Sequence, residues 1–145
     1  MRTQNSIIVG LVLLIYVITA CKPEPKAIAF GEEVCSYCTM TIVDTQHAAQ
    51  VVTKKGKVYS FDAIECMLRS DQVKEQEKMA LFLCSDYSAP GEMIDATKAT
   101  FLISEAVPSP MGANLSAFLS LDMARNIAAE HPAEFLTWEE LLVKF

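Results

Sequence analysis

The sequence predicts an α+β fold of two tandem homologous ββαβ units, which follow an N-terminal targeting segment and a short tether. Three observations predict it. Blocks of sequence recur in the same order, strand-like and helix-like periodicities alternate within each copy, and 145 residues allow one domain of ordinary size. The composition is 52% hydrophobic and 21% charged, which is typical of a globular chain.

The repeat defines the two units. Asp44 aligns with Asp95 and Ala48 with Ala99, and the alignment continues through two further blocks. The aligned blocks are 42–53 with 93–104, 61–67 with 118–124, and 82–86 with 135–139. A unit of about fifty residues buries little apolar surface by itself, so we expect the copies to share a core or to pack tightly together.

The first copy has a signal for each element. β-Branched alternation and an apolar run predict strands, Gly56 marks a turn, and Asp62 is well placed to cap a helix. The expected elements are strands over 48–53, 58–61 and 78–85, a turn over 54–57 and a helix over 63–70.

The second copy repeats the pattern with a longer hairpin loop, Ser104–Asn114, which carries Met111. Thr137 and Glu140 fit a capping box that opens a terminal helix over 138–145. The other expected elements are strands over 99–104, 114–119 and 133–137 and a helix over 121–131.

The N-terminus reads as a lipoprotein signal over residues 1–20. Arg2 precedes an apolar stretch, Ile7–Ile18, whose twelve residues give about 18 Å of helix, short of the roughly 30 Å needed to cross a bilayer. Ile18-Thr19-Ala20-Cys21 resembles the lipobox of bacterial lipoproteins, which implies cleavage before Cys21, acylation of that residue and a domain outside the cytoplasmic membrane, facing the periplasm or the cell exterior. A plain secretory signal is the alternative.

The mature chain then divides into three parts. Residues 21–30 form a lipid-anchored tether, 31–90 the first unit with a leader that contains Cys35, Cys38 and Met40, and 91–145 the second unit with the Met111 loop. The net charge of −6 argues against a nucleic-acid partner. No set of nucleophile, base and orienting residue and no phosphate loop is present in the sequence, so no enzymatic activity is expected.

The leader and the Met111 loop are the features that the two copies do not share, and function is expected there. Cys35, Cys38, Met40 and Met111 offer soft sulfur ligands, which favour Cu(I) over hard cations. If the copies lie side by side, the leader and the loop meet. His47 is a further candidate ligand, and its aligned partner Lys98 predicts an exposed position.

The remaining sulfur atoms are interpreted as packing residues. We expect Cys66 and Cys84 to be buried small side chains first and ligands second. The methionines at apolar positions of helix or strand blocks are expected to lie in the core. They are Met67, Met79, Met93 and Met123.

These motifs, CTMTI (38–42), IDA (94–96) and SPMG (109–112) behind a lipobox cysteine, resemble the NosL family of lipoproteins that accompany nitrous oxide reductase. The resemblance covers about residues 30–145. It implies two ββαβ units, Cu(I) as the bound ion, and delivery of copper to apo nitrous oxide reductase together with an associated membrane transporter.

The resemblance also assigns residues. The family's Cys-Gly-Met motif falls on Cys38, Thr39 and Met40, and its loop methionine falls on Met111. Thr39 in place of glycine is a departure that affects the local backbone. Cys35 is a second departure, either an extra ligand or the partner of Cys38 in a disulfide.

Two other functions remain open. The first is a structural zinc domain using Cys35, Cys38, Cys66 and Cys84, although the spacing of the last two is unlike a second zinc knuckle. A partial resemblance to TRASH-type domains points the same way, with Asp62 where those domains place their third cysteine. The second is a thiol–disulfide protein, for which the Cys-x-x-Cys pair lacks a following helix.

Overall fold

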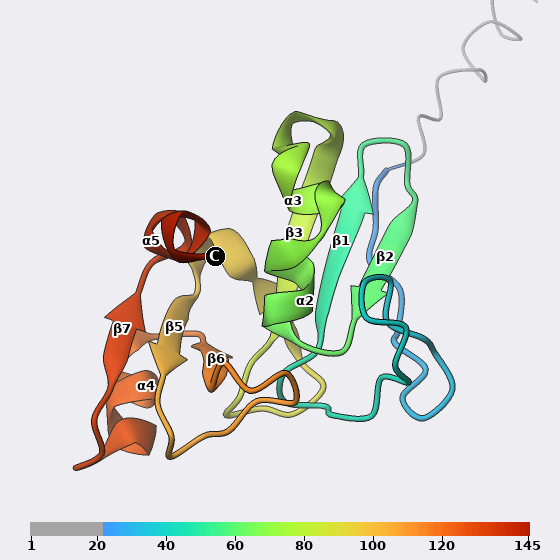
Figure 1. The fold of residues 1–145 in the computed structure, drawn as a ribbon. Helices are drawn as coiled ribbons and strands as arrows, with labels where there is room; N and C mark the ends of the chain where they lie inside the picture. The colour runs from blue at the N-terminus through green and yellow to red at the C-terminus, as the bar shows by residue number, and fades with distance from the viewer. Residues whose placement is uncertain (1–21) are drawn as a thin grey trace, which may run out of the picture.

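The computed structural model describes residues 22–145, which form two small antiparallel sheets with their helices (Figure 1). The first sheet, in the order β2-β1-β3-β4, contains β1 (Ala49–Thr53), β2 (Val58–Phe61), β3 (Met79–Ser85) and β4 (Met93–Asp95). The second sheet, in the order β6-β5-β7, contains β5 (Thr100–Ile103), β6 (Leu115–Phe118) and β7 (Glu134–Leu136). The helices are α2 (Ile64–Arg69), α3 (Asp71–Lys74), α4 (Leu121–Ala128) and α5 (Trp138–Lys144), with 3-10 turns η1 (Gln76–Lys78) and η2 (Ala96–Lys98).

The predicted α+β architecture with its two ββαβ units is confirmed, and strand pairing follows the sequence repeat. In each unit the first strand lies between the other two. Val51 of β1 pairs with Phe82, and the aligned residue Leu102 of β5 pairs with the aligned Phe135. The hairpins agree in the same way, because the blocks that match in sequence also match in register.

β4 joins the two units. This strand belongs to the block that opens the second repeat, yet it pairs antiparallel with β3 of the first sheet, with Cys84 opposite Ile94. The aligned aspartates, Asp44 and Asp95, have the same role in their two units. Asp44 Oδ1 accepts from His47 N–H (3.2 Å), and Asp95 Oδ1 accepts from Thr97 N–H (3.0 Å), so each carboxylate orders the turn before a central strand.

Helix starts differ in part from the prediction. α5 begins with the predicted capping box of Thr137 and Glu140. The N-cap residue of α2, however, is Ala63, and no side chain caps the helix, so the predicted capping role of Asp62 is wrong. Asp62 is buried, and its backbone N–H faces the Cys35 sulfur. α4 is shorter than predicted because the chain takes a positive φ at Ala129.

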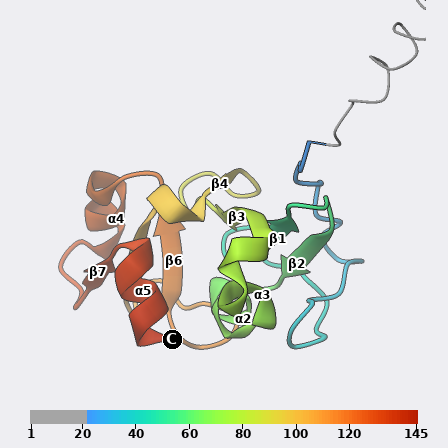
Figure 2. The ribbon, with the colours of Figure 1, turned by 90° about the horizontal axis from the view of Figure 1, so that it is seen from above.

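The two units share one hydrophobic core, and Figure 2 shows them side by side with α2 and α5 on the same side. Trp138 of α5 is 5% exposed and contacts Phe82 of the first sheet at 5.3 Å between ring centroids, and Phe101 of the second at 6.2 Å. Neither sheet therefore encloses this core by itself. A smaller cluster under α4 belongs to the second unit, and Tyr87 of the first unit packs against it.

The methionines divide between core and periphery. Met67 and Met79 are buried, as predicted. Met123 is half-buried and packs against the smaller cluster under α4, whereas Met93 is half-buried and belongs to neither cluster, so the core prediction is wrong for Met93. The reason for Met93 is its place on β4, the last strand of the first sheet, where its sulfur lies 3.6 Å from the Ser85 hydroxyl.

The N-terminal segment is partly docked on the first unit. Gln50 exchanges two hydrogen bonds with the backbone of Lys26 (3.2 and 3.1 Å), and Lys26 forms an ion pair with Glu33 (2.9 Å). The predicted signal over 1–20 and the predicted anchor Cys21 lie outside the described residues. Within 22–145, no helix combines the length and the apolarity needed to cross a bilayer.

The shared core generates the first prediction. Leu141→Ala should lower the free energy of unfolding by about 2–5 kcal/mol, because Leu141 of α5 is fully buried between the units. The domain should still unfold in one transition, measured by urea denaturation with both circular dichroism and Trp138 fluorescence. Val143→Ala on the same helix, at an 89% exposed position, is the control and should change stability by less than about 0.5 kcal/mol. Two separable transitions would contradict a shared core.

Candidate metal centre

Three thiols meet at the edge of the first unit. The Sγ atoms of Cys35, Cys38 and Cys66 all lie within 4.8 Å of one another. Cys35 and Cys38 belong to the leader, and Cys66 lies in the first turn of α2. The sequence had placed Cys66 among the packing residues, so this third thiol is the member of the cluster that sequence reasoning ranked too low. The partial TRASH-type resemblance, which uses Cys-x-x-Cys plus later cysteines, was the one signal for it.

The leader is a tight loop fastened to β2. Val34 and Thr41 form a β-bridge across its base, and Cys35 N–H donates to Met40 O (2.8 Å) inside it. Ser36 N–H donates to Ser60 O (2.8 Å), which holds the loop against the end of the hairpin. Because these are backbone bonds, the fold of the leader sets the position of its two thiols.

Thr39 adopts the left-handed conformation that a glycine would favour. Its φ is +64°, which costs about 1–2 kcal/mol for a residue with a side chain. Its hydroxyl donates to Cys38 O (2.6 Å). The loop geometry expected for a Cys-Gly-Met motif is therefore kept despite the threonine.

The thiols differ in burial and protonation. Cys35 and Cys66 are 2% and 1% exposed, whereas Cys38 is half-buried. A hydrogen bond from the Cys66 thiol, aided by backbone N–H groups of the loop, lowers the pKa of Cys35 to about 4 despite its burial. The same contact raises the pKa of Cys66, and burial raises the pKa of Cys38. Of the three thiols, Cys35 is therefore the most readily deprotonated, because the Cys66 thiol donates to its sulfur.

The leader also exposes apolar side chains around the thiols. Met40 is 53% exposed, beyond the bend at Thr39. Val34, Tyr37 and Val43 are exposed along the same ten residues. The outer side of the leader therefore carries exposed apolar side chains between exposed hydroxyl residues, Ser36, Thr39 and Thr41.

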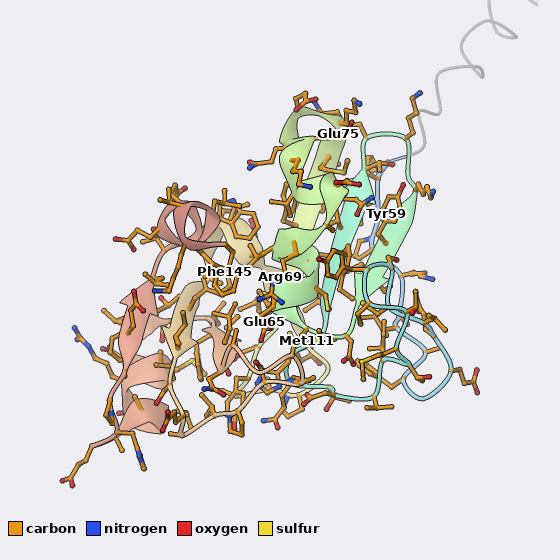
Figure 3. All side chains as sticks on the ribbon, in the orientation of Figure 1. Tyr59, Glu65, Arg69, Glu75, Met111 and Phe145 are labelled. Carbon is orange, nitrogen blue, oxygen red and sulfur yellow. The ribbon has the colours of Figure 1, made fainter. Side chains whose placement is uncertain are left out.

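The Met111 loop docks on the helix that carries Cys66 (Figure 3). Ala113 N–H and the Ser109 hydroxyl both donate to Glu65 of α2. Met111 is partly buried and packs against the same core cluster as Cys38. The second unit's loop thus contacts α2, the helix that bears Cys66, and a site shared by Met111 and the leader stays a prediction.

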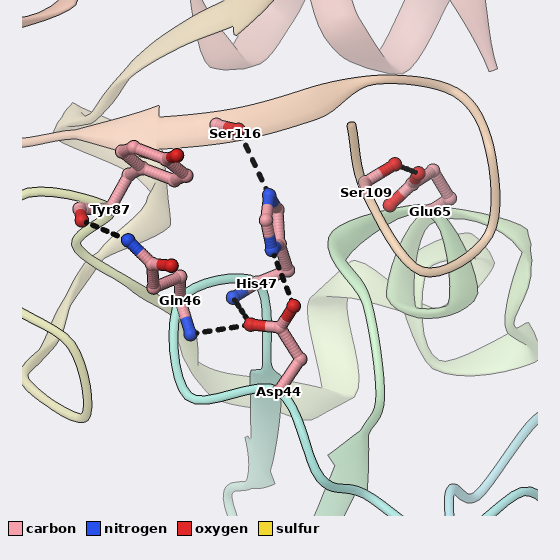
Figure 4. Close-up of polar contacts among 7 residues, drawn as sticks. All are labelled: Asp44, Gln46, His47, Glu65, Tyr87, Ser109 and Ser116. Atoms are coloured by element: carbon pink, nitrogen blue, oxygen red, sulfur yellow. Dashed lines mark hydrogen bonds and ion pairs between the residues drawn. The ribbon is translucent and has the colours of Figure 1, made fainter. Parts of the chain in front are cut away.

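His47 is placed differently from the prediction. It is 3% exposed, not exposed, and both ring nitrogens are occupied, Nδ1 by Asp44 (3.0 Å) and Nε2 by Ser116 (3.1 Å) (Figure 4). Its aligned residue Lys98 pairs with Asp95 in the same way (2.9 Å), but at the surface. The repeat thus predicts the partner correctly and the burial wrongly, because the His47 ring lies against Ser116 of the other unit whereas the Lys98 side chain is exposed. The proposed role of His47 as a metal ligand does not fit these contacts.

Asp44, His47 and Ser116 are hydrogen-bonded in the same sequence as the acid, base and nucleophile of a catalytic triad, but the serine hydroxyl is not accessible to a substrate. Ser116 lies in β6 and is fully buried, with no path for a substrate to its hydroxyl. Tyr87 packs edge-on against the imidazole at 5.5 Å between ring centroids. We interpret the chain as a polar bridge that fixes the two units relative to each other.

Cys84 lies apart from the other thiols. It is fully buried in β3, and burial raises its pKa. Within the part of the chain that the structure describes, the group of metal-ligand side chains contains three cysteines and not this fourth one. The four-cysteine zinc set is therefore not assembled.

Comparisons with known proteins agree on one family. The family model described as NosL matches residues 27–144. Among solved structures, the crystal structure of the copper chaperone NosL from Shewanella denitrificans superposes with a TM-score of 0.67 at 18% sequence identity, covering 81% of this chain and 95% of that one. A search of curated proteins found no match.

Thr39 generates the second prediction. Thr39→Gly should raise the free energy of unfolding by about 0.5–1 kcal/mol, because relief of the left-handed strain exceeds the extra freedom of glycine in the unfolded chain. The same change two residues away, Thr41→Gly, should lower it by about 0.5–1 kcal/mol. Thermal unfolding of the reduced proteins measures both. Equal destabilisation by the two variants would show that the bend at Thr39 is unstrained.

Proposed function

The chain belongs to the NosL family, and on this premise we propose that it is a Cu(I) carrier without catalytic activity. The observation that carries the proposal is the approach of three sulfur atoms to within 4.8 Å of one another. Cys35, Cys38 and Cys66 supply thiolates, and Met40 and Met111 supply thioethers. The solved relative described as a copper chaperone supports the same function.

The donor set favours Cu(I) over zinc. Thiolate and thioether sulfur are soft ligands that select Cu(I), whereas structural zinc takes four thiolate, imidazole or carboxylate ligands. Neither His47 nor Cys84 is available as a fourth zinc ligand, because His47 is hydrogen-bonded at both nitrogens and Cys84 lies outside the cluster. Methionines beside a thiol cluster have no use in a zinc site.

The cluster is close to the dimensions that a metal ion needs. An ion equidistant from three atoms 4.8 Å apart would lie about 2.8 Å from each, compared with metal–thiolate bonds of about 2.3 Å. A small inward movement of the side chains is sufficient. The lowered pKa of Cys35 favours the thiolate that binds metal, and binding of the ion displaces the protons of the thiols that coordinate it.

Transfer of copper is favoured by unequal exposure of the ligands. The thiols of Cys35 and Cys66 are buried, while Cys38 and Met40 face outward. A partner's ligands can therefore replace the outer sulfurs first, while the inner pair still holds the ion. We propose apo nitrous oxide reductase as the recipient and an associated membrane transporter as a second partner, in line with the family.

Anchoring completes the proposal. Cys21 would carry the lipid and place the domain at a bacterial membrane, in the periplasm or at the cell exterior. Lys22 begins the described chain, and the backbone is docked on the domain from Lys26 onward. The described chain is thus fastened to the domain from Lys26, five residues after the proposed anchor.

Metal competition tests the carrier function. Reduced protein should bind one Cu(I) in the presence of excess zinc, measured against a colorimetric Cu(I) chelator. Cys66→Ser should weaken binding by more than about tenfold, because it removes one of three clustered thiols. Loss of a metal ligand lowers the affinity more than loss of a residue that only hydrogen-bonds to a ligand, which costs about 10–100-fold. Cys84→Ala, at a buried thiol outside the cluster, should bind as the unchanged protein does. Stoichiometric retention of zinc, with unfolding on chelation, would support the structural zinc domain instead.

Cell fractionation tests the anchor. Cys21→Ala should move the protein from the membrane to the soluble fraction, because stable attachment needs acyl chains that contribute about 0.8 kcal/mol per buried CH₂. Cys84→Ala is the control and should remain with the membrane. A Cys21→Ala protein that still sediments after a salt wash would refute lipid anchoring.

A further inference from the structure

Glu65 is a buried carboxylate that connects the two units beside the thiol cluster. It lies in the first turn of α2, directly before Cys66, and is fully buried. Its Oε1 accepts from the Ser109 hydroxyl (Figure 4) and from Ala113 N–H (3.2 Å), both in the loop of the second unit. Its other oxygen, Oε2, is buried without a hydrogen-bond partner among the described residues.

The two donors flank Met111. Ser109 precedes it by two residues and Ala113 follows it by two, so a single oxygen atom holds both ends of a five-residue bend. Within the bend, Gly112 N–H donates to Ser109 O (3.0 Å), and Gly112 takes a φ of +77°. Met111 therefore projects from a short closed turn whose base is fastened to the residue next to Cys66.

Packing does not explain a carboxylate at this position. The other buried side chains of α2 are apolar apart from the Cys66 thiol, and burial of a carboxylate with one oxygen unpaired is costly. An apolar residue would fill the space at a lower cost but would leave the Met111 bend unfastened. What the carboxylate adds is an acceptor for two donors on the opposing unit.

We propose that Glu65 is the positioning residue for the Met111 thioether. By holding both ends of the bend against α2, it fixes the distance between Met111 and the thiols and so lowers the cost of bringing the thioether to copper. This inference rests on the proposed function, and it assigns Glu65 no direct bond to the ion.

A double-mutant cycle tests the proposal. Glu65→Ala should weaken Cu(I) binding by about tenfold in the unchanged protein, a size typical of residues that share one network, and should have no further effect in Met111→Ala. Glu65→Gln keeps an acceptor oxygen and should restore binding to near the original value. Ser109→Ala removes one of two donors and should have an intermediate effect.

Amide hydrogen exchange provides a readout in the copper-free protein. Exchange at Ala113 should speed up in Glu65→Ala and remain slow in Glu65→Gln, because that N–H is the donor to Oε1. Val73→Ala, at a buried position in α3, is the control for general destabilisation and should change neither Ala113 exchange relative to its neighbours nor Cu(I) affinity. Should Glu65→Ala fail to fold, Ser109→Ala carries the same cycle with Met111→Ala.

Three outcomes separate the inference from the function on which it rests. Failure of the unchanged protein to bind Cu(I) overturns the proposed function. Normal Cu(I) binding with a Met111→Ala effect, but none from Glu65→Ala or Ser109→Ala, overturns only the positioning role. An equal loss from Glu65→Ala with and without Met111 also overturns it, because Glu65 would then act through Cys66 or through stability.

Discussion

The core between the two units is the constraint on which the rest of the structure depends. Each sheet is small, with three or four short strands, and neither encloses enough apolar side chains to be stable by itself. Trp138 lies against aromatic residues of both sheets, and the cluster around it continues to Cys35 and Cys66. The site is therefore built at the join, and the same packing that stabilises the domain sets the distance between the leader and the opposing loop.

This placement divides the site into a fixed part and an accessible part. Cys35 and Cys66 are part of the core and move only with it. Cys38 and Met40 lie on either side of the bend at Thr39, and they are half-buried and exposed, respectively. A carrier must retain its ion and also release it, and ligands that differ in exposure allow replacement one at a time.

Much of the fold could be predicted from the sequence because the repeat gives strand order and register together. The pairing of Val51 with Phe82 and of Leu102 with Phe135 follows directly from aligned positions. The failures occur where the copies meet. His47 was expected at the surface because its aligned residue is a lysine, but the environment of a residue at the join depends on the other unit, and a repeat carries no information about that.

The site was predicted only in part for a related reason. The leader cysteines and Met111 stand out because the second copy lacks the leader and the first lacks the loop. From sequence, Cys66 is interpreted as a packing residue because it aligns with Met123, and Asp62 as a helix cap. In the structure both contact Cys35 of the leader, and this contact determines their roles. Contacts between segments distant in sequence decided these roles, and local patterns do not report them.

The pairing of β4 has a consequence for the symmetry of the duplication. In two equivalent copies, residues 42–44 would extend the second sheet at β7 as Met93–Asp95 extends the first at β3. Instead Ile42 bonds within the leader, donating to Glu33 O and accepting from Gly31 N–H (2.8 Å each). Residues 42–44 of the first copy therefore do not pair with β7, and this three-residue strand remains at the edge of the second sheet. Ile42 instead forms the base of the loop that carries Cys35 and Cys38. The binding site therefore lies where the two copies depart from exact twofold pairing.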